Sequence, residues 1–163
     1  MMNQPYKIKI FLTIPGEKKD GFGSFATEHF SYTGNVKDNL AHGRGELKYN
    51  HNDDFCKGLF ENGIFKRGVT QWAGNEYVGE FEDRNMNGKG MLKNKEWTYV
   101  GDFKDDEVHG TGKLTLKNGD VYYGGYSDGY REGRGSYSFL DGRLYIATWK
   151  KGEMHGRGKA ILP

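Results

Sequence analysis

Three histidines stand directly before Gly-x-Gly triplets, and imidazole is the commonest metal ligand among side chains. They are His42, His109 and His155. A zinc site needs three or four ligands that converge on one ion. The three histidines are 67 and 46 residues apart in the sequence, and these intervals span several units if the chain is a linear stack of repeats. We therefore expect no shared metal site.

Two other features could carry chemistry, a single cysteine and the Gly-x-Gly triplets themselves. Cys56 is the only cysteine, so an intrachain disulfide is impossible. A catalytic thiol needs a neighbouring base in a pocket, whereas Cys56 takes the tyrosine position of a repeat, which predicts a packed thiol. The triplets lack the following helix of a phosphate-binding loop. The sequence predicts no enzyme, no cofactor, no metal and no small-molecule substrate.

The residues that position these groups form a repeat of about 23 residues. One copy reads Tyr99-Val100-Gly101-Asp102-Phe103, six further residues, and then Gly110-Thr111-Gly112-Lys113-Leu114. Units start near residues 32, 56, 77, 99, 122 and 145, and their leading small residues are 24, 21, 22, 23 and 23 residues apart. The unit at Cys56 is the weakest, because Arg67 and Val69 stand where Gly-x-Gly belongs. A regular period of this length is typical of a repeat array.

Each unit is expected to be a β-hairpin. Residues two apart in a strand share a face, so the tyrosine, glycine and phenylalanine of one unit point the same way. Aromatic rings can lie over strand glycines, and we expect each ring to pack on its own glycines and on those of the next unit. The predicted fold is all-β, an elongated, single-layer, twisted antiparallel sheet of stacked β-hairpins.

Composition and charge agree with such an array. The chain has 163 residues with 26 Gly, 15% aromatic residues, 35% hydrophobic residues and a mean hydropathy of −0.85. This argues against a thick core, and the aromatic content argues against disorder. A net charge of +2 is too balanced for a nucleic-acid partner. No apolar run suits a signal peptide or a transmembrane helix, which predicts a soluble cytoplasmic protein.

The N-terminal part departs from the repeat. Residues 6–14 alternate between apolar and polar side chains, which predicts a strand, and residues 15–20 have the composition of a turn. We interpret residues 1–29 as an N-terminal strand and a degenerate capping hairpin. Residues 30–163 form one continuous repeat domain in this interpretation.

The sequence also places a set of cations on the face opposite the rings. The centres of the Gly-x-Gly triplets include Arg44, Lys89, Arg134 and Arg157. One interpretation is a solvated ladder of cross-strand ion pairs. The other is a strip that binds phosphate groups or lipid headgroups. The sequence leaves both open.

The repeat resembles a known family. The pattern Tyr-x-Gly-x-Phe, a polar turn and then His-Gly-x-Gly, as in Tyr99–Phe103 with His109–Gly112 and in Trp149–Gly152 with His155–Gly158, is similar to the MORN repeat (membrane occupation and recognition nexus). The resemblance covers about residues 30–160. It implies a non-enzymatic scaffold of the kind found in ciliary axonemes, protist cytoskeletons and membrane junctions.

From this resemblance we expect a scaffold that holds protein partners in a larger assembly, cytoskeletal or ciliary, with an organellar complex left open. Eight apolar residues either pack between units or anchor a partner: Phe55, Ile64, Phe65, Trp72, Trp97, Tyr123, Ile161 and Leu162. The last strand lacks a polar cap, so its edge is expected to pair with another chain. The alternative hypothesis is a peripheral membrane adaptor that binds anionic phospholipid headgroups through Arg44, Lys89, Arg134 and Arg157.

Overall fold

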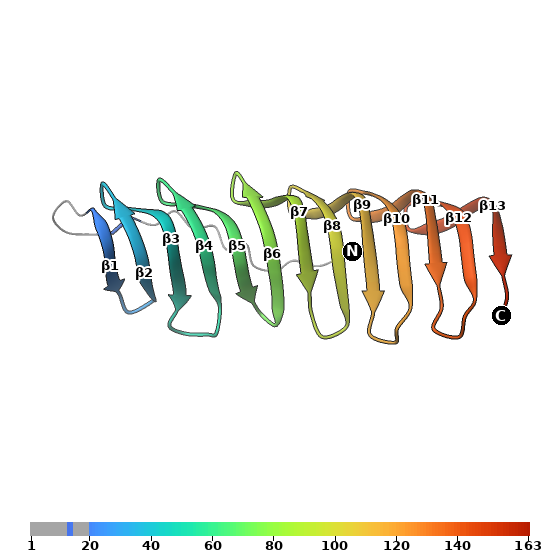
Figure 1. The fold of residues 1–163 in the computed structure, drawn as a ribbon, viewed down its shortest axis with the longest axis horizontal. Helices are drawn as coiled ribbons and strands as arrows, with labels where there is room; N and C mark the ends of the chain where they lie inside the picture. Colours follow the sequence, from blue (N-terminus) through green and yellow to red (C-terminus); the bar gives the residue numbers. More distant parts are fainter. Residues whose placement is uncertain (1–12, 15–19) are drawn as a thin grey trace. The chain divides into compact units, whose positions relative to one another are not determined.

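A computed structural model describes residues 13–14 and 20–163, and these residues form β-strands joined by turns (Figure 1). The strands are β1 (Gly21–Ala26), β2 (Phe30–Lys37), β3 (Leu40–Tyr49), β4 (Phe55–Glu61), β5 (Ile64–Trp72), β6 (Asn75–Glu82), β7 (Asn85–Lys93), β8 (Trp97–Lys104), β9 (Glu107–Leu116), β10 (Val121–Ser127), β11 (Tyr130–Ser138), β12 (Leu144–Lys150) and β13 (Glu153–Ile161). No helix that could span a membrane occurs in this described part.

The strands fall into two compact units that divide after Asn85. In the N-terminal unit, β1 to β6 lie side by side in chain order, and each pairs antiparallel with the next. In the C-terminal unit, β7 to β13 follow the same pattern. The predicted fold class, an all-β antiparallel sheet of successive hairpins, is confirmed.

Tight turns join the two strands of each hairpin. The two turn residues Asp38 and Asn39 have φ values of 50° and 61°, and Asp105 and Asp106 have 49° and 71°. Two successive positive φ values define the turn that matches the twist of an antiparallel hairpin. Asp and Asn tolerate this conformation better than other non-glycine residues. The polar residues between the two halves of each repeat therefore set the hairpin turn.

The Gly-x-Gly triplet has a different role at each of its glycines. The first lies in the left-handed region, with φ of 75° at Gly43 and 60° at Gly110, and forms part of a β-bulge in which the register shifts. The second, Gly45 or Gly112, faces a glycine of the neighbouring strand. The triplet thus bends the strand at one glycine and allows a close strand approach at the other.

Aromatic rings fill one face of each unit. In the C-terminal unit Tyr99, Tyr126, Tyr122 and Trp149 follow one another edge to face, with ring centroids 5.1–5.3 Å apart. These four rings are buried. Edge-to-face packing is a favoured arrangement of aromatic pairs. Ring edges therefore contact one another between successive hairpins.

The irregular hairpin that contains Cys56, β4–β5, also pairs two glycines, but its register differs from that of the other hairpins. Gly58 faces Gly68, so Gly68, and neither Arg67 nor Val69, takes the glycine position. The bulge in β5 is one residue shorter than in β3, because Leu59 pairs with Arg67 while Phe60 pairs with Phe65. The assignment of positions 67 and 69 from the sequence was wrong, since it assumed the regular bulge.

Phe65 replaces the ring that Cys56 lacks. Cys56 and Phe65 are both buried, and the Phe65 ring lies 5.1 Å from that of Phe60 and 5.3 Å from that of Phe81. In regular hairpins a tyrosine makes the link to the next hairpin. Phe65, which lies shortly after a turn of polar residues in the sequence, is therefore part of the core of the N-terminal unit.

The described residues include the end of the predicted N-terminal strand and of the turn that follows it. Residues 6–12 of the predicted strand and 15–19 of the predicted turn lie outside the described residues. Thr13 bridges Leu40 of β3, and Ile14 is buried in the core of the N-terminal unit. Strand β1 pairs with β2 in register from Gly21 to Ala26, so it belongs to the same sheet as the first regular repeat.

Candidate interaction surface

One row of small residues crosses the strands of each unit, with glycine at every position except Ala147. In the N-terminal unit the row is Gly23, Gly34, Gly45, Gly58, Gly68 and Gly79, each opposite the next. In the C-terminal unit it is Gly90, Gly101, Gly112, Gly124, Gly135 and Ala147. We call the side covered by aromatic rings the ring face and the opposite side the open face.

Tyrosines seal the glycine row on the ring face. A Cβ added to Gly45 or to Gly112 would collide with the ring of Tyr32 or of Tyr99, respectively. The hydroxyl of Tyr99 donates a hydrogen bond of 3.0 Å to the backbone oxygen of Asp102, beside the bulge. The repeat's tyrosine and glycines thus fill this face.

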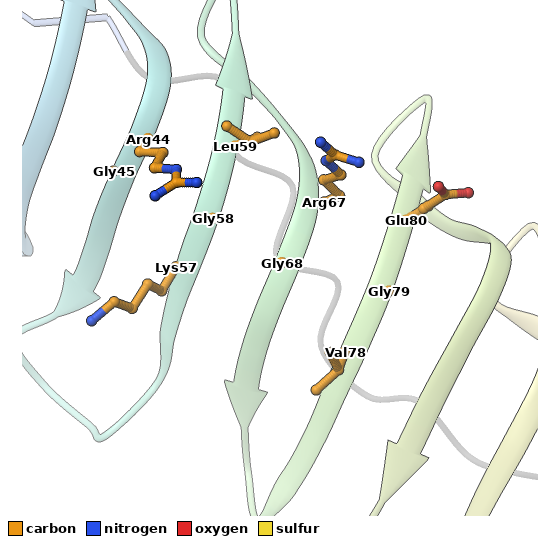
Figure 2. Close-up of a pocket in the computed structure, with 10 residues that line it drawn as sticks. All are labelled: Arg44, Gly45, Lys57, Gly58, Leu59, Arg67, Gly68, Val78, Gly79 and Glu80. Carbon is orange, nitrogen blue, oxygen red and sulfur yellow. The ribbon is translucent and has the colours of Figure 1, made fainter.

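The open face of the N-terminal unit carries a shallow groove of about 560 Å³. Its floor is the backbone of Gly45, Gly58, Gly68 and Gly79 (Figure 2). Arg44, Leu59, Arg67 and Glu80 line one side, and Lys57 and Val78 lie on the other side of the glycines. The groove lies over backbone positions whose own side chains would point to the ring face, so the two flanking rows of open-face side chains form its sides.

The groove has an excess of positive charge. Arg44, Lys57 and Arg67 line it against one carboxylate, that of Glu80. Lys57 lies 3.9 Å from a carboxylate oxygen of Glu46, and an exposed pair of this kind is worth at most about 1 kcal/mol. The groove therefore favours an anionic occupant.

The open face of the C-terminal unit carries a row with exposed apolar side chains. Its register runs Met91, Val100, Lys113, Tyr123, Ser136, Ile146 and Lys159, each opposite the next. Val100 is 51% exposed, Tyr123 56% and Ile146 46%. We call Val100, Tyr123 and Ile146 the apolar row. Neighbouring strands are about 4.8 Å apart, so the row spans about 20 Å.

The four predicted cations differ in their surroundings. Lys89 forms an ion pair with Asp102, and Thr111 donates its backbone N–H to the same carboxylate at 3.0 Å. The Lys89 ammonium and then the Thr111 amide hold the pKa of Asp102 below its usual range. Arg44 lines the groove, whereas Arg134 and Arg157 are exposed on β11 and β13. Of the two interpretations of these cations, the cross-strand ion pair is the one that applies to Lys89.

The eight apolar candidates separate by exposure. Phe65 and Trp72 are buried, Phe55, Ile64 and Trp97 are partly buried, and Tyr123, Ile161 and Leu162 are exposed. Phe65 and Trp72 therefore pack within the sheet, and the prediction that they are available to a partner was wrong. Tyr123 lies on the apolar row.

The histidines before the triplets occupy separate places. Asn62 donates its backbone N–H to Nδ1 of His42 at 3.5 Å, and Nδ1 of His109 lies 3.8 Å from a carboxylate oxygen of Asp128. His155 is exposed on β13. Within residues 13–14 and 20–163, no three His, Cys, Asp or Glu side chains form a possible metal cluster. Burial raises the pKa of Cys56 to about 12, as fits a packed thiol.

Sequence reasoning did not select Val100 and Ile146 as surface candidates, nor Lys57 and Arg67. The two apolar residues carried a usable signal, because strand alternation puts them on the solvent side, where polar residues are expected. Arg67 was missed because the assumed bulge placed it at a glycine position.

Comparisons with known proteins address the repeat directly. A family model described as MORN repeat matches residues 32–50, 99–121, 122–142 and 145–163, which together make up half of the chain. These ranges correspond to the hairpins β2–β3, β8–β9, β10–β11 and β12–β13. A search of curated proteins found no match.

Proposed function

The chain belongs to the MORN-repeat family, and we propose that it is a non-enzymatic scaffold that holds protein partners on the open faces of its units. MORN repeats are compatible with a repeat scaffold or with a membrane-binding role. The observation that carries the scaffold proposal is the apolar row of Val100, Tyr123 and Ile146, which are about half exposed.

The apolar row lies on the solvent side of the sheet, where strand alternation usually places polar residues. The C-terminal unit already buries four aromatic rings on its ring face, so the row is not needed for the core. Val100, Tyr123 and Ile146 lie on alternate strands, about 10 Å from one another, and tyrosine is enriched at interface hot spots. The alternating Lys113, Ser136 and Lys159 supply polar contacts between the apolar ones. A protein segment that crosses the strands fits this pattern.

The groove of the N-terminal unit supports the same proposal. Its floor is strand backbone, and Arg44, Lys57 and Arg67 give its two sides an excess of positive charge. A partner with an acidic segment would gain charge complementarity there, which raises association rates. Leu59 and Val78 provide apolar contact beside the cations.

The affinity test uses one double variant and one control. Tyr123→Ser with Ile146→Thr removes most of the apolar row, whereas Leu140→Ser removes an exposed leucine from the β11–β12 turn. Proteins that co-purify from the native cells with the wild-type chain should be lost with the double variant and kept with Leu140→Ser. Recovery of the same proteins with all three chains would reject the proposal.

The lipid alternative is supported by Arg134 and Arg157, which are exposed on the C-terminal unit. Polybasic surfaces gain about 1 kcal/mol per cation near an anionic membrane. Sedimentation with phosphatidylserine vesicles at low salt tests it, with charge reversal at Arg44, Lys89, Arg134 and Arg157 as the control. Binding that disappears on charge reversal would favour the membrane role.

We further propose that the assembly is cytoplasmic and belongs to the cytoskeleton or to a cilium. The support for this location is the resemblance to MORN-repeat scaffolds of such assemblies. Fluorescent tagging in ciliated cells that express the chain tests it. A uniform cytosolic signal in those cells would reject it.

A further inference from the structure

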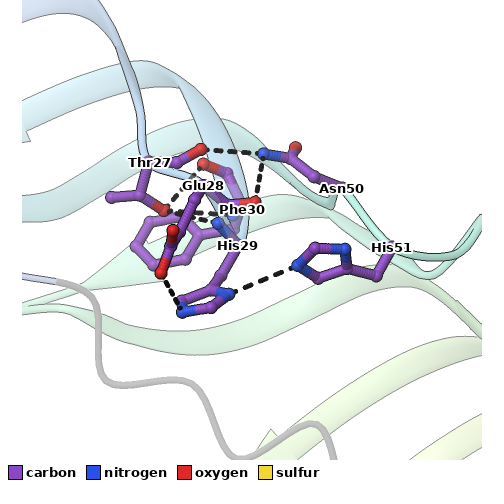
Figure 3. Close-up of polar contacts among 6 residues, drawn as sticks. All are labelled: Thr27, Glu28, His29, Phe30, Asn50 and His51. Carbon is purple, nitrogen blue, oxygen red and sulfur yellow. Dashed lines mark hydrogen bonds and ion pairs between the residues drawn. The ribbon is translucent and has the colours of Figure 1, made fainter.

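Two histidines from different turns meet at one end of the N-terminal unit. His29 lies in the turn between β1 and β2, and His51 lies in the turn between β3 and β4. Nδ1 of His29 is 3.3 Å from Nε2 of His51. Figure 3 shows the two rings facing each other, with Glu28 on the far side of His29. Of the five histidines in the chain, these two bring their ring nitrogens together.

The contact with Glu28 fixes which nitrogen of His29 is free to bind. Nε2 of His29 lies 3.0 Å from a carboxylate oxygen of Glu28, so the ring proton is best placed on Nε2. The lone pair of a neutral His29 is then on Nδ1, which faces His51. A carboxylate that holds the outer nitrogen of a histidine is the usual support of a metal-bound imidazole.

Hydrogen bonds join the two turns, so the two histidines are held close together before any ligand binds. The side-chain amide of Asn50 donates to the backbone oxygens of Thr27 at 2.8 Å and of Glu28 at 3.2 Å. The backbone N–H of Asn50 donates to the oxygen of His29 at 2.8 Å. The hydroxyl oxygen of Thr27 accepts hydrogen bonds from the backbone N–H groups of His29 and Phe30. A preorganised pair of ligands loses less entropy on binding.

The separation of the two nitrogens suits a shared ion. Zinc–imidazole bonds are about 2.0–2.1 Å long, and tetrahedral geometry then puts two ligand nitrogens about 3.3–3.4 Å apart. The observed 3.3 Å is at the long end for an N–H hydrogen bond. Both rings are exposed, which leaves room for water ligands on the solvent side.

We propose that His29 and His51 form a binding site for a divalent transition-metal ion of the zinc, nickel and copper class. Nδ1 of His29 and Nε2 of His51 are the protein ligands, water completes the coordination, and Glu28 orients His29. In the metal-free pair Nε2–H of His51 donates to Nδ1 of His29, so metal binding requires the neutral His51 ring to carry its proton on Nδ1 instead. Imidazole prefers these ions to magnesium and calcium, which prefer oxygen ligands. By the usual order of stability, copper binds most tightly.

Calorimetric titration of the full chain with zinc chloride and with nickel chloride at neutral pH tests the site. One ion per chain should bind, and magnesium chloride should give no heat of binding. His29→Ala and His51→Ala should each weaken binding by about tenfold or more. Glu28→Gln should weaken it by up to about tenfold. His155→Ala removes an exposed histidine elsewhere and should leave binding unchanged.

Thermal unfolding supplies a second readout, because an ion that binds only the folded chain raises its melting temperature. Zinc should raise the melting temperature of the wild-type chain and of His155→Ala, but not that of His29→Ala or His51→Ala. The proposal is overturned if zinc and nickel do not bind, or if only one of the two histidines matters. Equal loss with His155→Ala would also overturn it.

Discussion

The ring of Tyr99 lies over Gly112, which is on the neighbouring strand opposite Gly101. Its hydroxyl reaches the backbone oxygen of Asp102 at 3.0 Å, where the register of the two strands shifts. One tyrosine therefore covers a glycine pair and satisfies a carbonyl at the bulge. Tyr-x-Gly on one strand and Gly-x-Gly on the next are two parts of the same local structure.

Substituting the covered glycine should destabilise the sheet. A Cβ at Gly112 would overlap the hydroxyl and ring of Tyr99, so Gly112→Ala must displace a buried ring. We expect a loss of about 1–3 kcal/mol in the free energy of unfolding, measured by urea denaturation.

Gly23→Ala is the matched control, because Gly23 is in the glycine row of the N-terminal unit but has no atom within 4 Å of an added Cβ. Its effect should be neutral or slightly stabilising, since alanine restricts the unfolded chain. Equal losses at the two sites would mean that the ring does not need the bare backbone.

Phe65 should be essential to the irregular hairpin. Phe65→Ala removes the ring that contacts Phe60 and Phe81, and a buried phenylalanine truncated to alanine costs about 3–5 kcal/mol. Phe22→Ala is the control, because Phe22 is 75% exposed and should change stability by less than about 0.5 kcal/mol. Comparable effects in chemical denaturation would contradict the role given to Phe65.

Cys56 should be inert in the folded chain. Burial raises its pKa to about 12 from a usual value of 9.0, which lowers the thiolate fraction at about pH 8 by roughly a thousandfold. A thiol-specific reagent should therefore react slowly with the native chain and rapidly in denaturant. Rapid reaction of the native chain would show that this thiol is accessible.

Stability should fall at alkaline pH. Burial, as the main cause, raises the pKa of Tyr32 and of Tyr122 to about 12 from 10.0. In the unfolded chain these phenols ionise near 10, so the folded chain keeps protons that the unfolded chain has lost. The contribution of these two protonated phenols to the free energy of unfolding is fully present below pH 10 and is lost as the pH rises through about 12.

Circular dichroism with phenolate absorbance, followed from pH 9 to pH 12, measures this loss. The double variant Tyr32→Phe with Tyr122→Phe should show a shallower decline, because phenylalanine does not ionise. A decline of the same steepness in both chains would assign the alkaline transition to other groups.

The hairpins could be predicted from the sequence, because a period of about 23 residues and the Tyr-x-Gly pattern predict both strands of each hairpin. It was not sufficient for the register within the irregular hairpin. Gly68 takes the glycine position because β5 has a shorter bulge, and a bulge length is set by local backbone geometry. The core role of Phe65 follows from the missing ring at Cys56, and this depends on three-dimensional packing.

The candidate surface could be predicted only in part. Alternation correctly put Arg44 and Lys89 opposite the rings, but it could not tell that Lys89 is paired with Asp102. Tyr123 was selected for its type, and the structure shows its alignment with Val100 and Ile146 across the strands. This alignment depends on the bulges, which shift the register between the two strands of a hairpin. The pairing of His29 with His51 joins two turns 22 residues apart and has no signal in the repeat.

The claim that the open face holds a protein partner is tested most directly by site-specific photo-crosslinking in the native cells. A photoreactive phenylalanine analogue at position 123 or 146 should form a covalent adduct with a protein, whereas the same analogue at position 140, an exposed turn position, should not. Adducts that are absent at 123 and 146, or equally abundant at 140, would contradict the account.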